Sequence, residues 1–136
     1  MIKRRESWPE ALADYIDARH DESFEFGRMD CCRFAAGAVQ AMTGADPMAD
    51  VPTYASAREA AALLDDLGGL ERAASERLGD ATLPNRAGRG DIVLVFVDGI
   101  QALGVCLGDK VAAPSRSGLI FMSRACIEMT WTIPHG

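Results

Sequence analysis

Two adjacent cysteines, Cys31 and Cys32, are the residues of this sequence best suited to nucleophilic chemistry. They directly follow Asp30, a preferred N-cap residue type, so the sequence predicts that Cys31 lies in the first turn of a helix. Unpaired backbone N–H groups and the positive end of the helix dipole favour a thiolate at such a position. Paired with a histidine base, a thiolate of this kind is the nucleophile of cysteine hydrolases. The alternative is that both cysteines are small buried residues, because free cysteine packs as a hydrophobe.

Partners for such a nucleophile are few, because the sequence contains 2 histidines. His20 precedes Cys31 and His135 lies near the end of the chain, so either is a candidate substitute base. The sequence favours a plainer role for His20, as a partner of the helix dipole at the C-terminal end of a helix. The remaining cysteines, Cys106 and Cys126, stand alone, without the paired spacing of a zinc site. We therefore expect no metal and no cofactor.

The part of the chain around these cysteines, about 7–79, has the periodicity of helices. Ser7 and Glu10 form a capping-box pattern at its start, and Ser56 and Glu59 form a second one further on. The sequence predicts four helices: from Trp8 to about His20, from Asp30 to Thr43, from Ser56 to about Gly68, and from Leu70 to Leu78.

After Pro84 the pattern changes to the alternation of short strands. The expected strands are Asp91 to Val97, Ile100 to Leu107, Val111 to Ala113, Leu119 to Ser123, and Ile127 to Ile133. Asp98–Gly99 predicts a tight hairpin between the first two. Helices followed by strands predict one α+β domain over residues 1–136. In it the N-terminal helices, about 7–79, pack on one face of a C-terminal antiparallel sheet, about 90–134.

The same patterns predict where the cysteines lie. In the second expected strand, alternation puts Ala102, Gly104 and Cys106 on one face, which we expect to contact the helix that begins at Asp30. Cys106 falls on an expected strand and Cys126 directly precedes the last one, so we expect the strands to protect both from alkylation until the protein unfolds. Cys31 is then expected to be the most easily alkylated thiol.

Charge and hydropathy exclude several classes of protein. The 136 residues carry 20 acidic and 14 basic side chains, a net charge of −6 that argues against nucleic-acid binding. The longest strongly apolar run, Ile92–Val97, is too short to span a bilayer, so we expect no membrane insertion. The basic residues at 3–5 are followed by polar residues and a proline, unlike a secretory signal. We therefore expect the chain to be cytoplasmic when it is made.

Four segments resemble the NlpC-like cell-wall cysteine peptidases, which have a papain-like fold. Gly27–Phe34 (GRMDCCRF) is similar to their nucleophile segment, in which Asp-Cys opens a helix. Gly90–Val93 (GDIV) resembles the entry to their first core strand. Ala102–Gly108 (ALGVCLG) resembles the next strand, which reads His-Val-Gly-Ile-Tyr-Leu-Gly in active members, and Val111–Pro114 resembles the third. The resemblance covers nearly the whole chain and implies a papain-like NlpC-type fold with Cys31 as the nucleophile.

The resemblance also implies that the proton relay is missing. Ala102 stands where active members carry the histidine base, and a shift by one residue offers Gln101, which cannot accept a proton near neutral pH. The third member of the usual triad, a polar residue on the adjacent strand, falls on Ala112. The nucleophile Cys31 and the preceding Asp30 therefore match the family, whereas both relay positions carry alanine.

By this resemblance, the chain is expected to be a phage or prophage tail-tip or tail-assembly protein whose peptidase-like fold has lost catalysis. Its partners would be tail hub and tip proteins together with peptidoglycan, and its final location would be the virion tail. Two alternatives stay open. One is an active cysteine peptidoglycan endopeptidase or amidase that uses Cys31, and the other is a stand-alone cytosolic hydrolase of a small amide or thioester.

Overall fold

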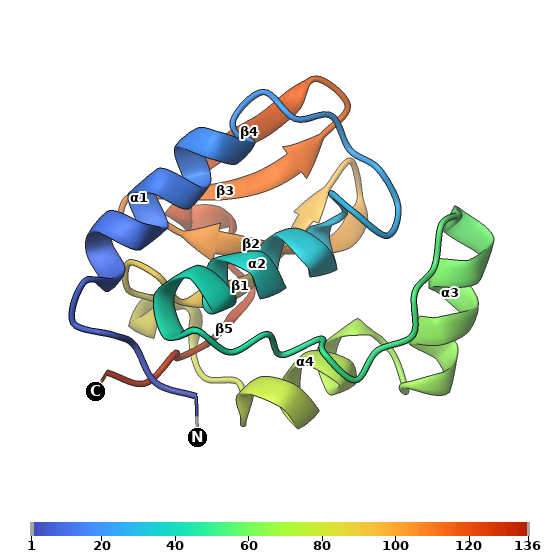
Figure 1. Ribbon diagram of the computed structural model, residues 1–136, viewed down its shortest axis with the longest axis horizontal. Helices are drawn as coiled ribbons and strands as arrows, with labels where there is room; N and C mark the ends of the chain where they lie inside the picture. Colours follow the sequence, from blue (N-terminus) through green and yellow to red (C-terminus); the bar gives the residue numbers. More distant parts are fainter. Residues whose placement is uncertain (1, 136) are drawn as a thin grey trace.

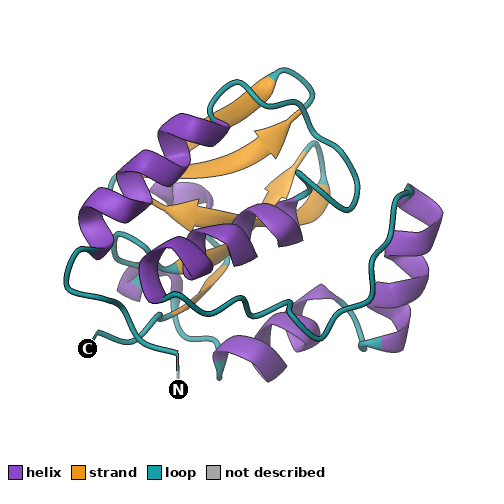
Figure 2. Ribbon diagram, in the orientation of Figure 1, coloured by secondary structure: helices purple, strands orange, loops and turns teal. Residues whose placement is uncertain are grey.

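The computed structural model describes residues 2–135 and has the predicted α+β arrangement, with helices first and strands second (Figure 1, Figure 2). The helices are α1 (Trp8–Arg19), α2 (Cys31–Thr43), α3 (Ala57–Asp66) and α4 (Leu70–Leu78). The strands are β1 (Ile92–Val97), β2 (Ile100–Cys106), β3 (Lys110–Ser115), β4 (Gly118–Ser123) and β5 (Met129–Trp131). Short 3₁₀ turns cover Pro84–Arg86 and Arg124–Cys126.

The strands form one antiparallel sheet in the order β4-β3-β2-β1-β5. The predicted turn at Asp98–Gly99 joins β1 to β2, and Asp98 adopts a φ of +52° there. The last strand is shorter than the predicted 127–133. It begins late because the chain first turns through the 3₁₀ segment, and it ends early because the N–H of Ile133 donates to the carboxylate of Asp91 instead of a neighbouring strand.

Helix α2 begins and ends where the sequence predicts. Asp30 is its N-cap, and the Asp30 carboxylate accepts a hydrogen bond from the N–H of Arg33 at 2.8 Å. Gly44 ends the helix at a φ of +83°, and its N–H donates to the carbonyl of Gln40 at 2.8 Å. Cys31 is therefore the first residue of the helix.

The two predicted capping boxes behave differently. Ser56 caps α3, because its hydroxyl accepts the N–H of Glu59 at 3.1 Å. The capping box predicted for α1 is wrong, since the side chain of Ser7 makes no capping hydrogen bond. Ser7 has a φ of −87° and a ψ of 18°, not the extended conformation that aims an N-cap hydroxyl into the first turn.

Helices α1 and α2 lie across the same face of the sheet, and the main core fills the space between them and the strands (Figure 1). Tyr15 connects α1 to α2. Its hydroxyl donates to the carbonyl of Phe34 at 2.8 Å, and the rings of Tyr15 and Phe34 stack. The core residues of α2 are Phe34, Ala35, Ala38, Val39 and Met42, and those of the strands that face them include Ile92, Leu94, Leu103, Val105 and Ala112.

The prediction that Ala102, Gly104 and Cys106 face α2 is wrong. Leu103 and Val105 face that helix, while Ala102 and Cys106 belong to a second cluster on the opposite side of the sheet. A methyl group added at Gly104 would likewise meet Val111 of that second cluster, at 2.8 Å. The physical reason is volume: the inner stripe of α2 is rich in alanine, so the larger strand residues fill the space beneath it. A shift of one residue along a strand exchanges its two faces.

A buried ion pair connects both ends of the described chain to the sheet. Arg4 and Asp91 are joined at 2.7 Å, and their side chains are 2% and 6% exposed. The Arg4 guanidinium also donates to the carbonyls of Ile133 and Arg89, while Asp91 accepts the N–H groups of Ile133 and Gly88. Most of these bonds join segments that are distant in sequence, and the bond from Gly88 closes a loop. The ion pair therefore fixes the positions of β1, the N-terminal segment and the C-terminal segment relative to one another.

Candidate functional site

The site is built around the carboxylate of Asp30, which is 5% exposed. Besides the N–H of Arg33, it accepts the N–H of Gly27 at 2.8 Å and the hydroxyl of Tyr54 at 2.6 Å. Gly27 has a φ of +84°, and a Cβ there would overlap the carbonyl oxygen of Tyr54. Asp30 therefore joins the loop before α2, the helix itself and the loop before α3, and it fixes the position of Cys31.

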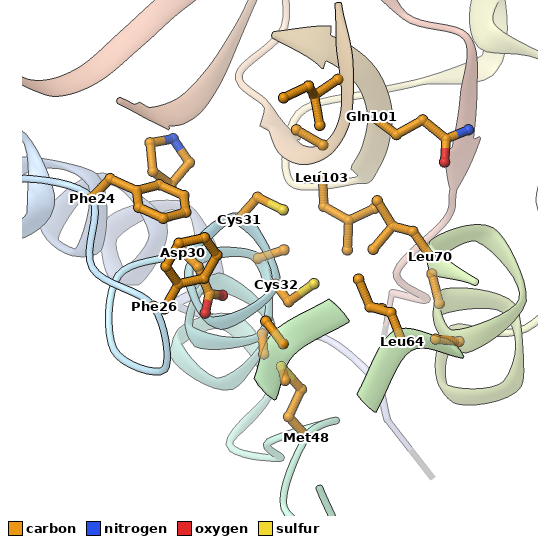
Figure 3. A pocket seen from close by; sticks show the side chains of 18 of the residues that line it. Phe24, Phe26, Asp30, Cys31, Cys32, Met48, Leu64, Leu70, Gln101 and Leu103 are labelled. Carbon is orange, nitrogen blue, oxygen red and sulfur yellow. The ribbon is translucent and has the colours of Figure 1, made fainter. Parts of the chain in front are cut away.

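Both thiols of the adjacent pair point into a cavity, toward Leu64, Leu70 and Leu103 (Figure 3). A hydrogen bond from the Cys32 thiol lowers the pKa of Cys31, against the opposing effects of burial and of the Asp30 carboxylate. Donating that hydrogen bond, together with burial, raises the pKa of Cys32. Cys31 is therefore the member of the pair whose thiolate form is favoured, as its place at the start of α2 predicts.

Tyr54 is the functional-site residue whose contacts the sequence did not reveal. Burial and the hydrogen bond to Asp30 both raise the pKa of its hydroxyl, so Tyr54 remains a neutral donor at ordinary pH. The guanidinium of Arg33 lies over the Tyr54 ring, 5.2 Å from its centroid. No local pattern marks this contact, because Tyr54 and Asp30 are separated by a helix and a loop.

The cavity has a volume of about 980 Å³. Its walls come from α2, α3, α4, the loop between α2 and α3, and the ends of the β1–β2 and β3–β4 hairpins. Most of the lining is apolar. The apolar side chains include Phe24, Phe26, Val39, Met48, Val51, Leu64, Leu67, Leu70, Leu78, Ile92 and Leu103.

The structure does not bring either histidine to Cys31. Both lie within the described residues, and neither lines the cavity. The ring of His20 stacks on Phe121, and its Nδ1 lies 2.9 Å from Asp21 on the outer side of α1. His135 packs edge-on against Trp8. Neither candidate substitute base therefore reaches the thiol in this conformation.

The two relay positions lie on opposite faces of the sheet. Ala112 faces α2, and Ala102 belongs to the cluster on the other side. Gln101, the alternative offered by a shift of one residue, has the same orientation as Leu103 and lines the cavity (Figure 3). Ala102 also lines the cavity, and Cys31 packs against the cluster that contains Ala102, so the part of β2 beside Cys31 carries an amide, a methyl and an aliphatic side chain and no imidazole.

The other two cysteines differ from each other. Cys106 is 0% exposed, and its thiol donates weakly to the carbonyl of Gly108. Cys126 is exposed, because it lies in the 3₁₀ turn after β4. The prediction that Cys126 is protected on a strand is therefore wrong.

Within residues 2–135, no group of three or more His, Cys, Asp or Glu side chains is placed to hold a metal ion. Nor does this part of the chain contain a helix long and apolar enough to cross a membrane.

Fold and site together define an α+β protein with a helix-capping aspartate, a cysteine pair and an apolar cavity. The chain belongs to the family described as "Domain of unknown function (DUF6950)", whose profile matches residues 3–133. No curated protein matches the sequence.

Proposed function

We propose that this chain has an NlpC-like, papain-like fold that has lost catalysis and that it serves as a phage or prophage tail-tip or tail-assembly protein. The observation that carries the loss of catalysis is the surroundings of Cys31. Gln101, Ala102 and Leu103 occupy the part of β2 that lines the cavity beside the thiol, and both histidines of the sequence lie elsewhere.

The magnitude of the missing contribution supports this reading. A positioned general base increases the reaction rate by about 10²–10⁴-fold. Loss of one member of a hydrolytic triad can cost on the order of 10⁶ in turnover, because the members act as a unit. The neighbouring Asp30 offers no replacement, since its carboxylate already accepts three hydrogen bonds and lies within the protein.

The tail assignment rests on the resemblance of four sequence segments to the NlpC-like group. Under it, the chain is made in the cytoplasm and then joins hub and tip proteins of the virion tail, where peptidoglycan is within reach. A fold kept without its chemistry would then act through its surfaces.

The test compares the wild type with Cys31→Ala and, as a control, Cys126→Ala. We expect no measurable release of stem peptides or glycan fragments from peptidoglycan by any of the three proteins. We also expect Cys31→Ala to support tail assembly as well as the wild type does in a complementation assay. Turnover by the wild type and Cys126→Ala that Cys31→Ala abolishes would contradict the loss of catalysis. Normal infectious tails formed without the chain would contradict the tail role.

One observation favours the second candidate, an active cysteine peptidoglycan endopeptidase or amidase. Cys31 stands at the start of α2 with a lowered pKa, as a cysteine nucleophile does. If the wild type does turn over, His20→Ala and His135→Ala identify the base. The one that removes activity while leaving the folded state intact would have to reach Cys31 by a change in conformation.

A further inference from the structure

The cavity beside Cys31 is larger and more apolar than the proposed function requires. Its volume of about 980 Å³ is at the upper end of the range of small-molecule sites, about 300–1,000 Å³. Peptidoglycan stem peptides and glycans are polar and charged, so they do not match a lining of leucine, valine, methionine and phenylalanine. The apolar volume therefore calls for a different occupant.

The packing of helix α3 indicates that the cavity is an integral part of the fold. No residue of α3 is buried, although the helix has an apolar side. That side is turned to the cavity: Ala57, Ala60, Ala61, Leu63 and Leu64 all line it. Leu64 also reaches the edge of the main core, where its side chain lies opposite the two thiols (Figure 3). A helix that presents its apolar side to a cavity gains its packing partner when that cavity is filled.

Apart from the wall beside Cys31, where Asp30, Tyr54 and Gln101 lie, polar side chains occur at two places in the lining. One is the mouth formed by the hairpin ends, with exposed residues such as Asp98 and Arg116. The other is Arg77 of α4, whose side chain is only 18% exposed. Its Nη1 donates to the carbonyl of Ala73 at 3.3 Å and its Nη2 to the exposed Asp50 at 3.4 Å, so both hydrogen bonds are long. Arg77 therefore places a weakly paired positive charge at the α4 end of the cavity, which suits an anionic group.

We propose that the cavity binds a single-chain amphiphile, with its hydrocarbon chain between α2, α3 and the sheet and its anionic end at Arg77. The chain contacts the leucines of α3 and α4 and passes the two thiols, which are weak hydrogen-bond partners and tolerate an apolar neighbour. The carboxylate of a fatty acid accepts from the guanidinium in place of the distant Asp50. This proposal does not depend on the tail assignment or on the loss of catalysis.

The first test is a titration of the full chain with straight-chain carboxylates of increasing length, from octanoate to tetradecanoate, below their micelle concentrations. Each buried methylene contributes about 0.8 kcal/mol, so affinity should rise about fourfold per added carbon. The alcohol of the same length should bind at least about tenfold more weakly than the acid, because it lacks the charge-assisted hydrogen bond. No binding, or an affinity independent of chain length, overturns the proposal.

Matched variants locate the bound chain. Ala60→Phe on α3 puts a ring into the cavity and should weaken binding about tenfold or more, while Ala62→Phe, on the same helix but outside the lining, should not. Arg77→Gln should weaken binding of the acid and leave the alcohol unchanged, with Arg116→Gln as the control at the mouth. Equal effects of the two α3 variants would show that the ligand binds elsewhere. An effect of Arg116→Gln without one of Arg77→Gln would overturn the assigned direction of the chain.

Discussion

Asp30 is the residue on which the geometry of the site depends. Its carboxylate accepts hydrogen bonds from Gly27, Arg33 and Tyr54, which lie in three different segments of the chain. A carboxylate with this many partners acts as a structural anchor. The role of Asp30 beside Cys31 is therefore to hold the loop and the helix start together.

Removing the Tyr54 hydroxyl should destabilise the protein in a pH-dependent way. We expect Tyr54→Phe to cost about 1–3 kcal/mol, because it leaves a buried carboxylate with one fewer donor. The raised pKa of Tyr54 means that the folded state binds its proton more tightly than the unfolded state does. This contribution is therefore complete below the unfolded pKa of about 10 and is lost as pH rises above it. Urea unfolding at pH 7 and at pH 10.5 measures both effects.

Tyr15 supplies the control for this experiment. Burial also raises the pKa of its hydroxyl, which donates to the carbonyl of Phe34. Tyr54→Phe should therefore reduce the alkaline loss of stability without removing it, and the double variant with Tyr15→Phe should remove most of the remainder. An undiminished alkaline loss in Tyr54→Phe would contradict the assigned hydrogen bond to Asp30.

The four thiols should separate by exposure and pKa. Under native conditions we expect iodoacetamide to label Cys31 and Cys126, while Cys106 stays unmodified until the protein unfolds. The rate at Cys31 should reach its midpoint below the ordinary pKa of a cysteine thiol, because a lowered pKa gives more thiolate at any given pH. Cys32 should react slowly, since its pKa is raised. Peptide mass spectrometry over a pH series measures all four, and native labelling of Cys106 would contradict its place in the core.

At the scale of elements, the two faces of β2 contact different hydrophobic clusters. Leu103 and Val105 fill the space under the alanine-rich side of α2, and Gly104 leaves room on the opposite face for the side chain of Val111 from the neighbouring strand β3. A Cβ at Gly104 would lie 2.8 Å from Val111 and 3.0 Å from the carbonyl oxygen of Ala112. The glycine is therefore required by the contact between β2 and β3.

Gly104→Ala tests this contact. We expect a loss of about 1–3 kcal/mol in the free energy of unfolding, because backbone as well as side-chain atoms must move to admit the methyl group. Gly88→Ala is the control, since its nearest neighbour, a carboxylate oxygen of Asp91, lies 3.7 Å away. That variant should change stability by less than about 0.5 kcal/mol. Equal stability of the two variants would show that the sheet adjusts freely around β2.

Local sequence patterns predict most of the helices and strands, but they do not predict contacts between residues that are distant in sequence. The N-cap at Asp30, the turn at Asp98–Gly99 and the end of α2 at Gly44 depend on a few adjacent residues, and all are confirmed. The contact between Tyr54 and Asp30 depends on where a distant loop passes, which no periodicity encodes. The predicted orientation of β2 is wrong because small residues alternate along the strand. The sequence pattern suggests that these small residues contact α2, although the space left by α2 favours the larger Leu103 at that contact.

At the scale of the whole molecule, the pair formed by Arg4 and Asp91 connects the beginning of the chain, β1 and the C-terminal segment. The sequence marks Arg4 only as part of a basic cluster, because its partner lies 87 positions away. Both groups are buried and have further hydrogen bonds, so each depends on the other for its charge to be compensated.

Breaking this pair should destabilise the whole fold. We expect Arg4→Met to cost about 3–5 kcal/mol, because it leaves the buried Asp91 carboxylate uncompensated. The double variant Arg4→Met with Asp91→Leu should be less destabilised than the single one, since no unpaired charge remains. Arg5→Met is a control in the same segment but outside the ion pair. Chemical denaturation measures the series, and a double variant at least as unstable as Arg4→Met would contradict the role assigned to the charge.

The two terminal segments lie side by side, so the order of the segments along the chain can be changed by circular permutation. The backbones of Arg4 and His135 form a parallel bridge, and the N–H of Arg4 donates to the carbonyl of Pro134 at 2.7 Å (Figure 1). A short peptide linker could therefore close the backbone into a ring. New ends could be opened at Gly68–Gly69, between α3 and α4, where the backbone turns with positive φ and a Cβ at Gly69 would meet nothing within 4 Å. Such a circular permutant would keep every strand pairing of the sheet while releasing one wall of the cavity. Folding of the sheet and formation of the cavity could then be measured separately.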